Sequence, residues 1–405
     1  MNRIDQAIIF AGGMGVRLRP FTEKKPKPMY CFNNMPFLEY LILQIKGWGI
    51  TDIIILVGYL SEIITEYFGD GSRWGITIRY VKTPVEYDTG LRLKAAENIL
   101  HDMFLMMYCD NICPIDFKRL TREYNENNAL IQVSAYSNDD LYTRDNMIIS
   151  ENGMVKLYDK QRTSKGLRGV DIGYALISKK VLSLIDSENC NFESIVYPKL
   201  VKEQKLYATV TKHRYYSIGS FERIELTRRF LSGQKYIFLD RDGVINERPP
   251  KANYVCKPED FKWIAGAKKA LKKLQEEGFF IIIVSNQAGI ARGAMTEHDF
   301  ELVQAKMESD LEEVGVTIGA VYHCPHGWDE NCECRKPKPG MLYMAQKDYS
   351  INLTECVLIG DDERDIITAH NANMKGILVT DDYSLEDAVN DIIKGIIRDY
   401  EVNEL

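Results

Sequence analysis

The stretch YIFLDRDGV (236–244) decides the fold of the second half of this chain. Its first four residues, all apolar or aromatic, predict a buried strand, and the polar turn Asp240-Arg241-Asp242-Gly243 follows directly. Open α/β sheets place ligand-binding side chains just beyond the carboxyl ends of their strands. The pattern therefore predicts a parallel sheet with a polar site at Asp240.

The same alternation of strands and helices extends outward in both directions. Apolar runs that read as strands lie at 7–10, 52–58, 76–81, 236–239, 280–286 and 357–360. Stretches with helical periodicity lie between them, at 37–49, 61–69, about 265–277 and about 297–314. We expect two Rossmann-like α/β domains, each a parallel sheet covered by helices.

The boundary between the two domains is expected where SGQK (232–235) follows the helical stretch FERIELTRRFL (221–231). We place the first domain at 1–233 and the second at 234–405. The total of 405 residues agrees with this division, because it exceeds what one hydrophobic core usually organises.

The composition excludes several classes of protein. With 45% hydrophobic and 27% charged residues the chain resembles a globular protein, and no apolar run approaches the roughly 18 residues of a membrane helix. The amino-terminal residues do not fit a signal peptide, so we expect a cytoplasmic protein with no membrane partner. A net charge of −7 argues against a nucleic-acid partner. The oligomeric state stays open, with a homo-oligomer as one alternative.

The second domain carries the ordered elements of a phosphoaspartyl phosphatase. Asp240 is the candidate nucleophile, and Asp242, two positions along, is the candidate acid/base; Mg²⁺ would offset the repulsion between a carboxylate and a phosphomonoester. Four further candidates bind the phosphoryl group: Ser285, Asn286, Arg335 and Lys336. Candidate magnesium ligands are Asp240, Asp242 and Asp361, with Asp362 and Asp365 as neighbours.

A second metal is predicted from four soft ligands within eleven residues, Cys324, His326, Cys332 and Cys334. Three thiolates and one imidazole suit a closed tetrahedral Zn²⁺ site. We expect this zinc to be structural and to order the loop beside Arg335 and Lys336. The other cysteines are isolated and read as core thiols.

These motifs, DRDGVIN, SNQAGIARG and CRKPKPG, resemble the haloacid dehalogenase superfamily, in its heptose bisphosphate and histidinol phosphate phosphatase branch. The resemblance implies magnesium binding by Asp361 and the backbone carbonyl of Asp242, and phosphate binding by Ser285 and Lys336. Asp362 stands where relatives often carry a basic residue. The short zinc loop leaves heptose and histidinol substrates open.

The first domain begins with AGGMGVRL (11–18), followed by Pro20, Thr22 and Lys27. The backbone of Ala11, Gly12, Gly13 and Gly15 can approach nucleotide phosphates, Arg17 can hold the pyrophosphate leaving group, and Lys27 can bridge the attacking phosphate. The spacing is neither a dinucleotide fingerprint nor a P-loop. The long pattern GGxGxRLxPxTxxxPKP resembles the sugar-phosphate nucleotidyltransferases over residues 5 to 230.

That resemblance implies roles for further residues. Asp110 corresponds to a magnesium-binding aspartate, Thr89 and Gly90 to a base- and sugar-binding segment, Lys160 to a lysine that contacts the substrate phosphate, and Gly173 and Glu193 to sugar-binding positions. The alternative that stays open is that Lys160 and Glu193 are plain surface charges. Ser217 stands where relatives usually carry a second metal-binding aspartate, which leaves Asp110 and the nucleotide phosphates to hold Mg²⁺.

Together the two resemblances imply a Rossmann-like nucleotidyltransferase sheet followed by a phosphatase sheet of haloacid dehalogenase type. We expect a heptose 1,7-bisphosphate 7-phosphatase fused to a heptose 1-phosphate guanylyltransferase, with GTP and sugar phosphates as partners. Two alternatives stay open. One is a CTP-dependent enzyme for another phosphorylated sugar or polyol, and the other is a phosphatase with a non-catalytic nucleotide-binding domain.

Overall fold

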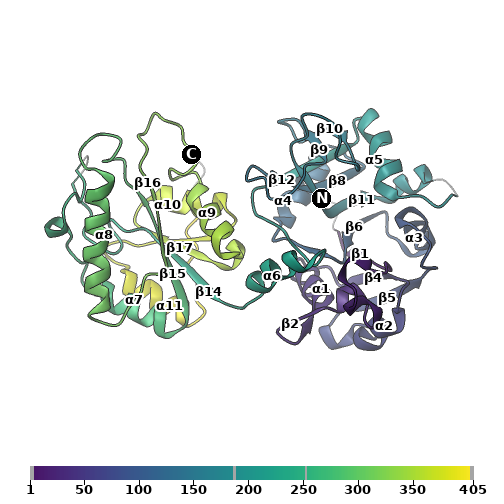
Figure 1. The fold of residues 1–405 in the computed structure, drawn as a ribbon, viewed down its shortest axis with the longest axis horizontal. Coiled ribbons are helices and arrows are strands. Elements are labelled where there is room, and N and C mark those ends of the chain that lie inside the picture. The colour runs from purple at the N-terminus through teal and green to yellow at the C-terminus, as the bar shows by residue number, and fades with distance from the viewer. Residues whose placement is uncertain (1–3, 186–187, 251–252, 402–405) are drawn as a thin grey trace. The chain divides into compact units, whose positions relative to one another are not determined.

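The computed structural model describes residues 4–185, 188–250 and 253–401, and the chain forms two compact units, Met1–Ser232 and Gly233–Leu405. Each unit is an α/β fold, as the alternation of apolar runs predicts (Figure 1). Among the described residues no helix is both long and apolar enough to cross a membrane.

The first unit is built on a seven-stranded sheet. Its strands, in spatial order, are β12 (Leu206–Thr211), β8 (Ile131–Tyr136), β11 (Val170–Ser178), β6 (Met103–Tyr108), β1 (Gln6–Ala11), β4 (Asp52–Val57) and β5 (Thr77–Lys82). The helices are α1 (Phe37–Gly47), α2 (Ser61–Phe68), α3 (Thr89–Ala95), α4 (Phe117–Glu126), α5 (Phe192–Lys202) and α6 (Phe221–Phe230).

The expectation of a fully parallel first sheet is wrong at one strand. β11 runs antiparallel to both of its neighbours, β6 and β8, whereas the other pairings in this sheet are parallel. Buried apolar runs do not encode strand direction, because a strand covered on both faces has the same composition in either orientation.

The two faces of this sheet bury two hydrophobic clusters. Along β1, Ile9 contributes to the cluster with α1 and α2, and Ile8 to the cluster with α3 and α5. Because successive side chains of a strand point to opposite faces, each apolar run supplies both cores. The sheet thereby holds the carboxyl ends of β1 and β6 side by side.

Two short strand pairs extend the first unit. β7 (Asn111–Ile112) pairs antiparallel with β13 (Tyr216–Ser217), so the segment after β6 lies against the segment that leads into α6. The other small elements are β2 (Cys31–Phe32) with β3 (Met35–Pro36), and β9 (Met147–Ile149) with β10 (Val155–Tyr158).

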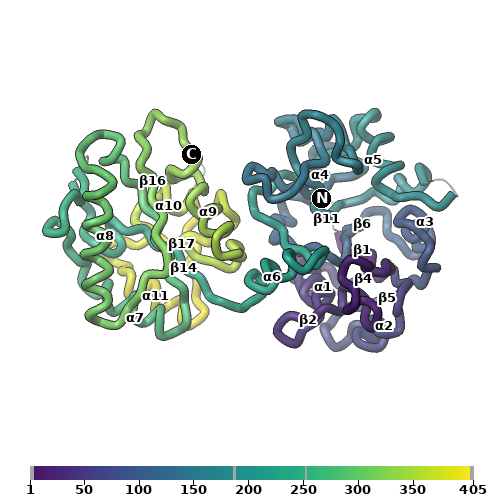
Figure 2. The backbone as a smooth tube through the Cα atoms, viewed as in Figure 1, coloured from purple at the N-terminus to yellow at the C-terminus, as the bar shows by residue number. Residues whose placement is uncertain are grey.

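The second unit is a five-stranded parallel sheet, as predicted. In spatial order its strands are β16 (Ala320–Cys324), β15 (Phe279–Asn286), β14 (Lys235–Leu239), β17 (Val357–Gly360) and β18 (Lys375–Leu378). Its helices are α7 (Ala267–Glu276), α8 (Glu297–Glu312), α9 (Gly340–Tyr349), α10 (Glu363–Asn371) and α11 (Leu385–Ile393). In Figure 2 the backbone passes through a helix between each strand and the next.

The strand order of the second unit determines where its ligands can bind. β14 is first in sequence and central in space, and the chain fills one side with β15 and β16 and the other with β17 and β18. At such a switch point two neighbouring connections leave in opposite directions and open a crevice at the carboxyl ends of the strands. Asp240 follows β14 and therefore lies at this crevice.

Candidate active sites

The phosphatase candidates converge beyond the ends of β14, β15 and β17. Asp240 follows β14, Ser285 lies near the end of β15, and Asp361 follows β17. Arg335 and Lys336 differ from this pattern, because they lie in the loop that leads from β16 to α9. The structure places the Lys336 side chain, which is 3% exposed, against Asp240, with its Nζ atom 2.9 Å from Asp240 Oδ1.

Lys336 is held by a second carboxylate that the sequence indicated only as a neighbour of Asp361. Its Nζ atom lies 2.5 Å from Asp365 Oδ1 and donates to the Val284 carbonyl at 3.1 Å. Burial opposes the charge of this ammonium, but the two carboxylates outweigh burial and raise the pKa of Lys336. The site therefore holds a permanent cation next to the candidate nucleophile.

Asn286 positions the backbone of Lys336. Its Oδ1 atom accepts from the Lys336 amide at 3.1 Å, and its Nδ2 atom donates to the Lys336 carbonyl at 3.3 Å. The Asn286 side chain thus holds the backbone of Lys336 with both of its polar atoms. Arg335, predicted to hold the phosphoryl group, donates to the His326 carbonyl at 3.3 Å, so its guanidinium lies at the zinc loop.

Three carboxylates of this site suit a hard divalent cation. Ligand atoms of Asp240, Asp361 and Asp365 all lie within 4.8 Å of one another. Oxygen donors are the ligands that Mg²⁺ prefers. Burial raises the pKa of Asp361 to about 6. The nearby Asp365 carboxylate also raises this pKa, whereas Arg248 lowers it. A cation bound here would favour the ionised carboxylates.

Gly243 allows Asp361 to approach the turn after β14. Its backbone has φ +97°, and a Cβ atom there would lie 1.9 Å from Asp361 Oδ2. Both the backbone conformation and the space therefore require glycine. This explains why the DRDG turn ends as it does.

The side chain of Asp242 points to three donors rather than to the other carboxylates. Arg241 contacts both of its oxygens, with Nη2 at 3.2 and 3.0 Å, Asn246 donates to Oδ1 at 2.9 Å, and Gln287 donates to Oδ2 at 2.8 Å. Burial opposes ionisation of Asp242, but Arg241 and these hydrogen bonds lower its pKa. Sequence reasoning missed Arg241, Asn246 and Gln287, although Arg241 and Gln287 directly adjoin predicted site residues.

Asp362 does not add free negative charge to the magnesium candidates. It begins α10 as its N-cap, and its carboxylate pairs with Arg248 at 2.9 Å and with Arg364 at 2.8 Å. Arg248 also lies 3.2 Å from Asp361 Oδ2. The two arginines, which sequence reasoning missed, compensate the charge that the sequence alone suggests.

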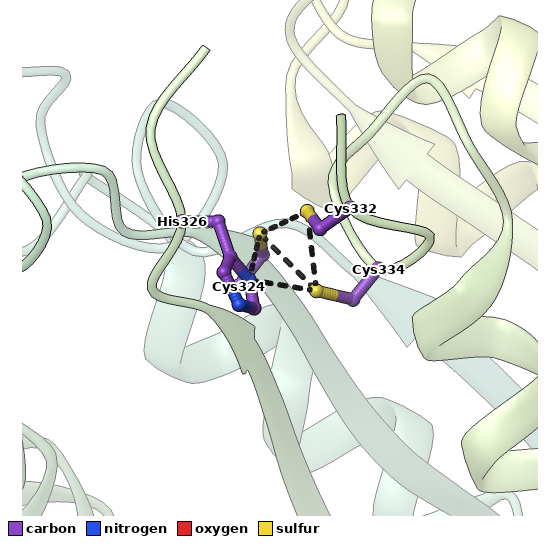
Figure 3. A group of neighbouring side chains, drawn as sticks. All are labelled: Cys324, His326, Cys332 and Cys334. Carbon is purple, nitrogen blue, oxygen red and sulfur yellow. Dashed lines mark hydrogen bonds between the residues drawn. The ribbon is translucent and has the colours of Figure 1, made fainter. Parts of the chain in front are cut away.

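The four predicted zinc ligands converge at one point (Figure 3). The Cys334 Sγ atom lies 3.4 Å from Cys324 Sγ, 3.5 Å from Cys332 Sγ and 3.2 Å from His326 Nδ1. Sulfur atoms around one tetrahedral zinc ion at 2.3 Å lie about 3.7 Å apart, so the described donors fit this ion. All three cysteines are free thiols rather than disulfides.

The nucleotidyltransferase candidates gather at the ends of β1 and β6. Lys27 Nζ lies 2.5 Å from Asp110 Oδ2, and the Lys27 side chain packs against Gly15, whose φ is +60°. Burial opposes the charge of Lys27, but the Asp110 carboxylate outweighs burial, so the pKa of Lys27 is raised. The exposed Arg17 has a smaller effect and lowers this pKa. Lys27 thus forms an ion pair with Asp110 and interacts electrostatically with Arg17.

Ser217 lies beside Asp110, where the sequence pattern predicted a metal-binding position. It pairs with Asn111 across the β13–β7 ladder, and the Ile218 amide donates to the Asp110 carbonyl at 3.0 Å. The departure from an aspartate is therefore located at the candidate metal site itself, where it removes one carboxylate.

Lys160 and Glu193 form an ion pair of 2.8 Å rather than two isolated surface charges. Glu193 is buried and also accepts a hydrogen bond from the Tyr108 hydroxyl. Gly173 packs on the Tyr108 ring with φ +81°. Asp171, which was not a candidate, completes this cluster; burial and the nearby Glu193 raise its pKa to about 7.

Thr89 and Gly90 contact the segment before α5. The Thr89 hydroxyl accepts from the Phe192 amide at 2.8 Å, and the Gly90 amide donates to the Cys190 carbonyl at 2.9 Å. Arg92, missed from the sequence, is buried beside the glycine turn. It donates to the Tyr87 carbonyl at 2.8 Å, and a Cβ atom on Gly12 would lie 2.0 Å from its Nη1 atom. Gly12 and Gly13 directly follow Ala11, the last residue of β1.

Two parts of the chain match families of known proteins. Residues 6–162 match the nucleotidyl transferase family, and residues 333–399 match the HAD-hydrolase-like family. The chain therefore combines a nucleotidyltransferase and a phosphomonoesterase of haloacid dehalogenase type.

Curated relatives also match this chain. A D-glycero-alpha-D-manno-heptose-1,7-bisphosphate 7-phosphatase from Photorhabdus laumondii is 43% identical over 147 residues, which are 35% of this chain and 79% of that protein. A D-glycero-beta-D-manno-heptose-1,7-bisphosphate 7-phosphatase from Haemophilus ducreyi is 39% identical over 150 residues, or 35% of this chain and 81% of that protein. Through these residues the chain belongs to the D-glycero-D-manno-heptose-1,7-bisphosphate 7-phosphatase family.

Among solved structures, HddC from Yersinia pseudotuberculosis complexed with GMP-PN is 23% identical, with a TM-score of 0.48. The match covers 56% of this chain and 98% of that chain.

Proposed function

We propose that this chain removes the 7-phosphate of a D-glycero-D-manno-heptose 1,7-bisphosphate and then joins the remaining heptose 1-phosphate to GMP from GTP. The observation that supports the first step is the ion pair between Lys336 and Asp240, which lies among the three clustered carboxylates. The relatives of the second unit support the choice of sugar.

In the phosphatase step, Asp240 attacks phosphorus and forms an aspartyl phosphate while the bond to the sugar oxygen breaks. Asp242, which is ionised in the free site, receives the proton of the monoanionic phosphate ester and passes it to the departing alkoxide; it then takes a proton from the water that hydrolyses the aspartyl phosphate. Ser285 holds a phosphoryl oxygen, and the Lys336 ammonium, which contacts Asp240, supplies positive charge beside the phosphoryl group. Mg²⁺ at Asp240 and Asp361 would neutralise negative charge between the carboxylate and the phosphate.

In the transferase step, a sugar phosphate oxygen attacks the α-phosphorus of the nucleoside triphosphate and pyrophosphate leaves. The glycine turn at 12–15 would hold the nucleotide phosphates, with Arg17 on the departing pyrophosphate and Lys27 on the attacking phosphate. Lys160, Gly173 and Glu193 would bind the sugar phosphate. Catalysis of this kind depends on positioning and on charge neutralisation.

The order of the two steps follows from their chemistry. A bisphosphate carries two phosphoryl groups, and removal of one leaves the single phosphate that becomes part of the nucleotide sugar. A histidinol phosphatase offers no such task to the first unit, so the fusion favours the sugar substrate.

The test incubates the full chain with Mg²⁺, heptose 1,7-bisphosphate and each nucleoside triphosphate in turn, and follows phosphate, pyrophosphate and nucleotide sugar. We expect phosphate release followed by GDP-heptose. Asp240→Asn should abolish phosphate release, and with heptose 1-phosphate supplied it should retain pyrophosphate release. Asp110→Asn should do the reverse.

Other outcomes identify the alternatives. Turnover of CTP without turnover of GTP would reject the guanylyltransferase assignment. Nucleotide binding without pyrophosphate release from any triphosphate, and no effect of Asp110→Asn, would identify the first unit as a non-catalytic module, as the serine at position 217 suggests.

A further inference from the structure

The side-chain amide of Gln287 lies between two groups that act on the same phosphate. Its Nε2 atom donates to Asp242 Oδ2 at 2.8 Å and to Ser285 Oγ at 2.8 Å. Gln287 is 1% exposed, so these two bonds form away from solvent. The amide therefore connects the candidate acid/base with the candidate phosphate-binding hydroxyl.

The hydrogen-bond inventory of these three groups leaves little freedom. An amide nitrogen carries two hydrogens, and both are used here, one on Asp242 and one on Ser285. An ionised carboxylate only accepts, so the amide oxygen cannot take the place of the nitrogen facing Asp242. Because Ser285 Oγ accepts from Gln287, the single hydroxyl proton of Ser285 remains available for a phosphoryl oxygen.

The backbone around Gln287 is held on both sides. The Gln287 amide donates to the Cys324 carbonyl at 2.8 Å, and the preceding residue, Asn286, brackets the backbone of Lys336. The glutamine side chain thus projects from a segment that is tied to β16 and to the loop of the candidate catalytic lysine. A side chain with this support can impose a position on its partners.

We propose that Gln287 is a positioning residue of the phosphatase, which sets Asp242 Oδ2 at the correct place relative to the phosphoryl group held by Ser285. The inference rests on the proposed roles of Asp242 and Ser285. Proton donation requires the acid within hydrogen-bond reach of the oxygen that leaves. Loss of the amide frees Asp242 on this side, with Arg241 and Asn246 still attached.

A dependence on the leaving group separates this role from a structural one. Sugar and alkyl phosphates release a basic alkoxide that needs the proton, whereas p-nitrophenyl phosphate releases a stable phenolate that leaves without it. A misplaced acid therefore slows the first kind of substrate selectively. General damage to the site would slow both.

The experiment compares Gln287→Met with the unchanged full chain, with Mg²⁺ present, on heptose 1,7-bisphosphate and on p-nitrophenyl phosphate. Methionine is close to glutamine in size and keeps the site filled. We expect kcat on the bisphosphate to fall about 10- to 100-fold with little change in KM, and kcat on p-nitrophenyl phosphate to change less than about threefold. Gln304→Met, which alters a buried glutamine of α8, is the matched control.

Asp242→Asn is assayed in parallel and should show the selective loss. If it does, an equal loss of activity on both substrates in Gln287→Met, or no loss on either, would overturn the inference. If Asp242→Asn also fails to distinguish the two substrates, the proposed role of Asp242 is wrong and the inference is refuted with it. Ser285→Ala should slow both substrates, because it removes a phosphoryl contact that each of them uses.

Discussion

Lys336 lies 2.9 Å from Asp240 although the two residues belong to different loops of the second unit. The Lys336 ammonium also forms an ion pair of 2.5 Å with Asp365 Oδ1. One buried ammonium therefore balances two carboxylates, and its removal should affect both folding and catalysis.

Lys336→Met should destabilise the second unit by about 3–5 kcal/mol, because it leaves buried carboxylates without their cation. Phosphate release should be lost, while pyrophosphate release persists in the other unit. Calorimetric unfolding with both activity assays checks this. Lys338→Met, which changes a partly exposed lysine of the same loop, should have little effect, and equal losses in the two variants would contradict the prediction.

Gly243→Ala should abolish most phosphatase activity, because its Cβ atom would lie 1.9 Å from Asp361 Oδ2. Gly278 is the matched control. It also has a positive φ, of +80°, but nothing lies within 4 Å of the added Cβ atom. Both alanine variants should lose about 1–2 kcal/mol through backbone strain. Assay of phosphate release should show a large loss only for Gly243→Ala; comparable activity in the two would refute the steric argument.

Cys332→Ser should remove bound zinc and lower the melting temperature of the second unit, since one of four soft ligands is lost. Elemental analysis of the purified chain measures the metal directly, with about one zinc per chain expected before the substitution. Cys256→Ser, outside the cluster in the same unit, should keep the metal. Full zinc content in Cys332→Ser would show that the cluster is not the zinc site.

Ser217→Asp should lower the magnesium concentration needed for half-maximal pyrophosphate release by several fold, because it returns a carboxylate beside Asp110. A magnesium titration of the transferase reaction measures the change. Ser217→Asn is the uncharged control and should leave the midpoint in place. An unchanged midpoint in Ser217→Asp would mean that position 217 does not face the metal.

Asp171 should make the first unit less stable as pH rises from about 4 to about 7. Its pKa in the folded chain is about 7, well above the ordinary value of an aspartate, so the folded state holds the proton more tightly and unfolding releases it in this range. Asp171→Asn should flatten this dependence by about 1–3 kcal/mol. Melting temperatures across this pH range, with exposed Asp139→Asn as control, provide the measurement; parallel curves for Asp171→Asn and the unchanged chain would disprove it.

Much of the fold and part of the candidate sites could be predicted from local pattern. Apolar runs placed six of the sheet strands, β1, β4, β5, β14, β15 and β17, to within a few residues, because burial on both faces of a sheet demands such runs. The four zinc ligands lie within eleven residues, so one loop can bring them together. The direction of β11 was not predictable, since neither its composition nor its length depends on orientation.

Contacts between segments that are distant in the sequence could not be predicted from local sequence patterns. The pairing of Arg248 with Asp361 and Asp362, and the burial of Arg92 against Gly12, join residues that no motif connects. Such contacts depend on which strands become neighbours. A charged residue in a sequence can be a cap, a surface charge or a site residue, and only its neighbours distinguish these roles.

By itself the sequence determined the two α/β units, the turn that carries Asp240 and the soft metal ligands, because each depends on residues close together along the chain. Only the tertiary structure decided that Lys336 joins Asp240 to Asp365, that Gln287 joins Asp242 to Ser285, and that Ser217 lies beside Asp110. The physical reason is that hydrogen bonds and ion pairs act over about 3 Å, and the strand order alone brings these distant residues within that range.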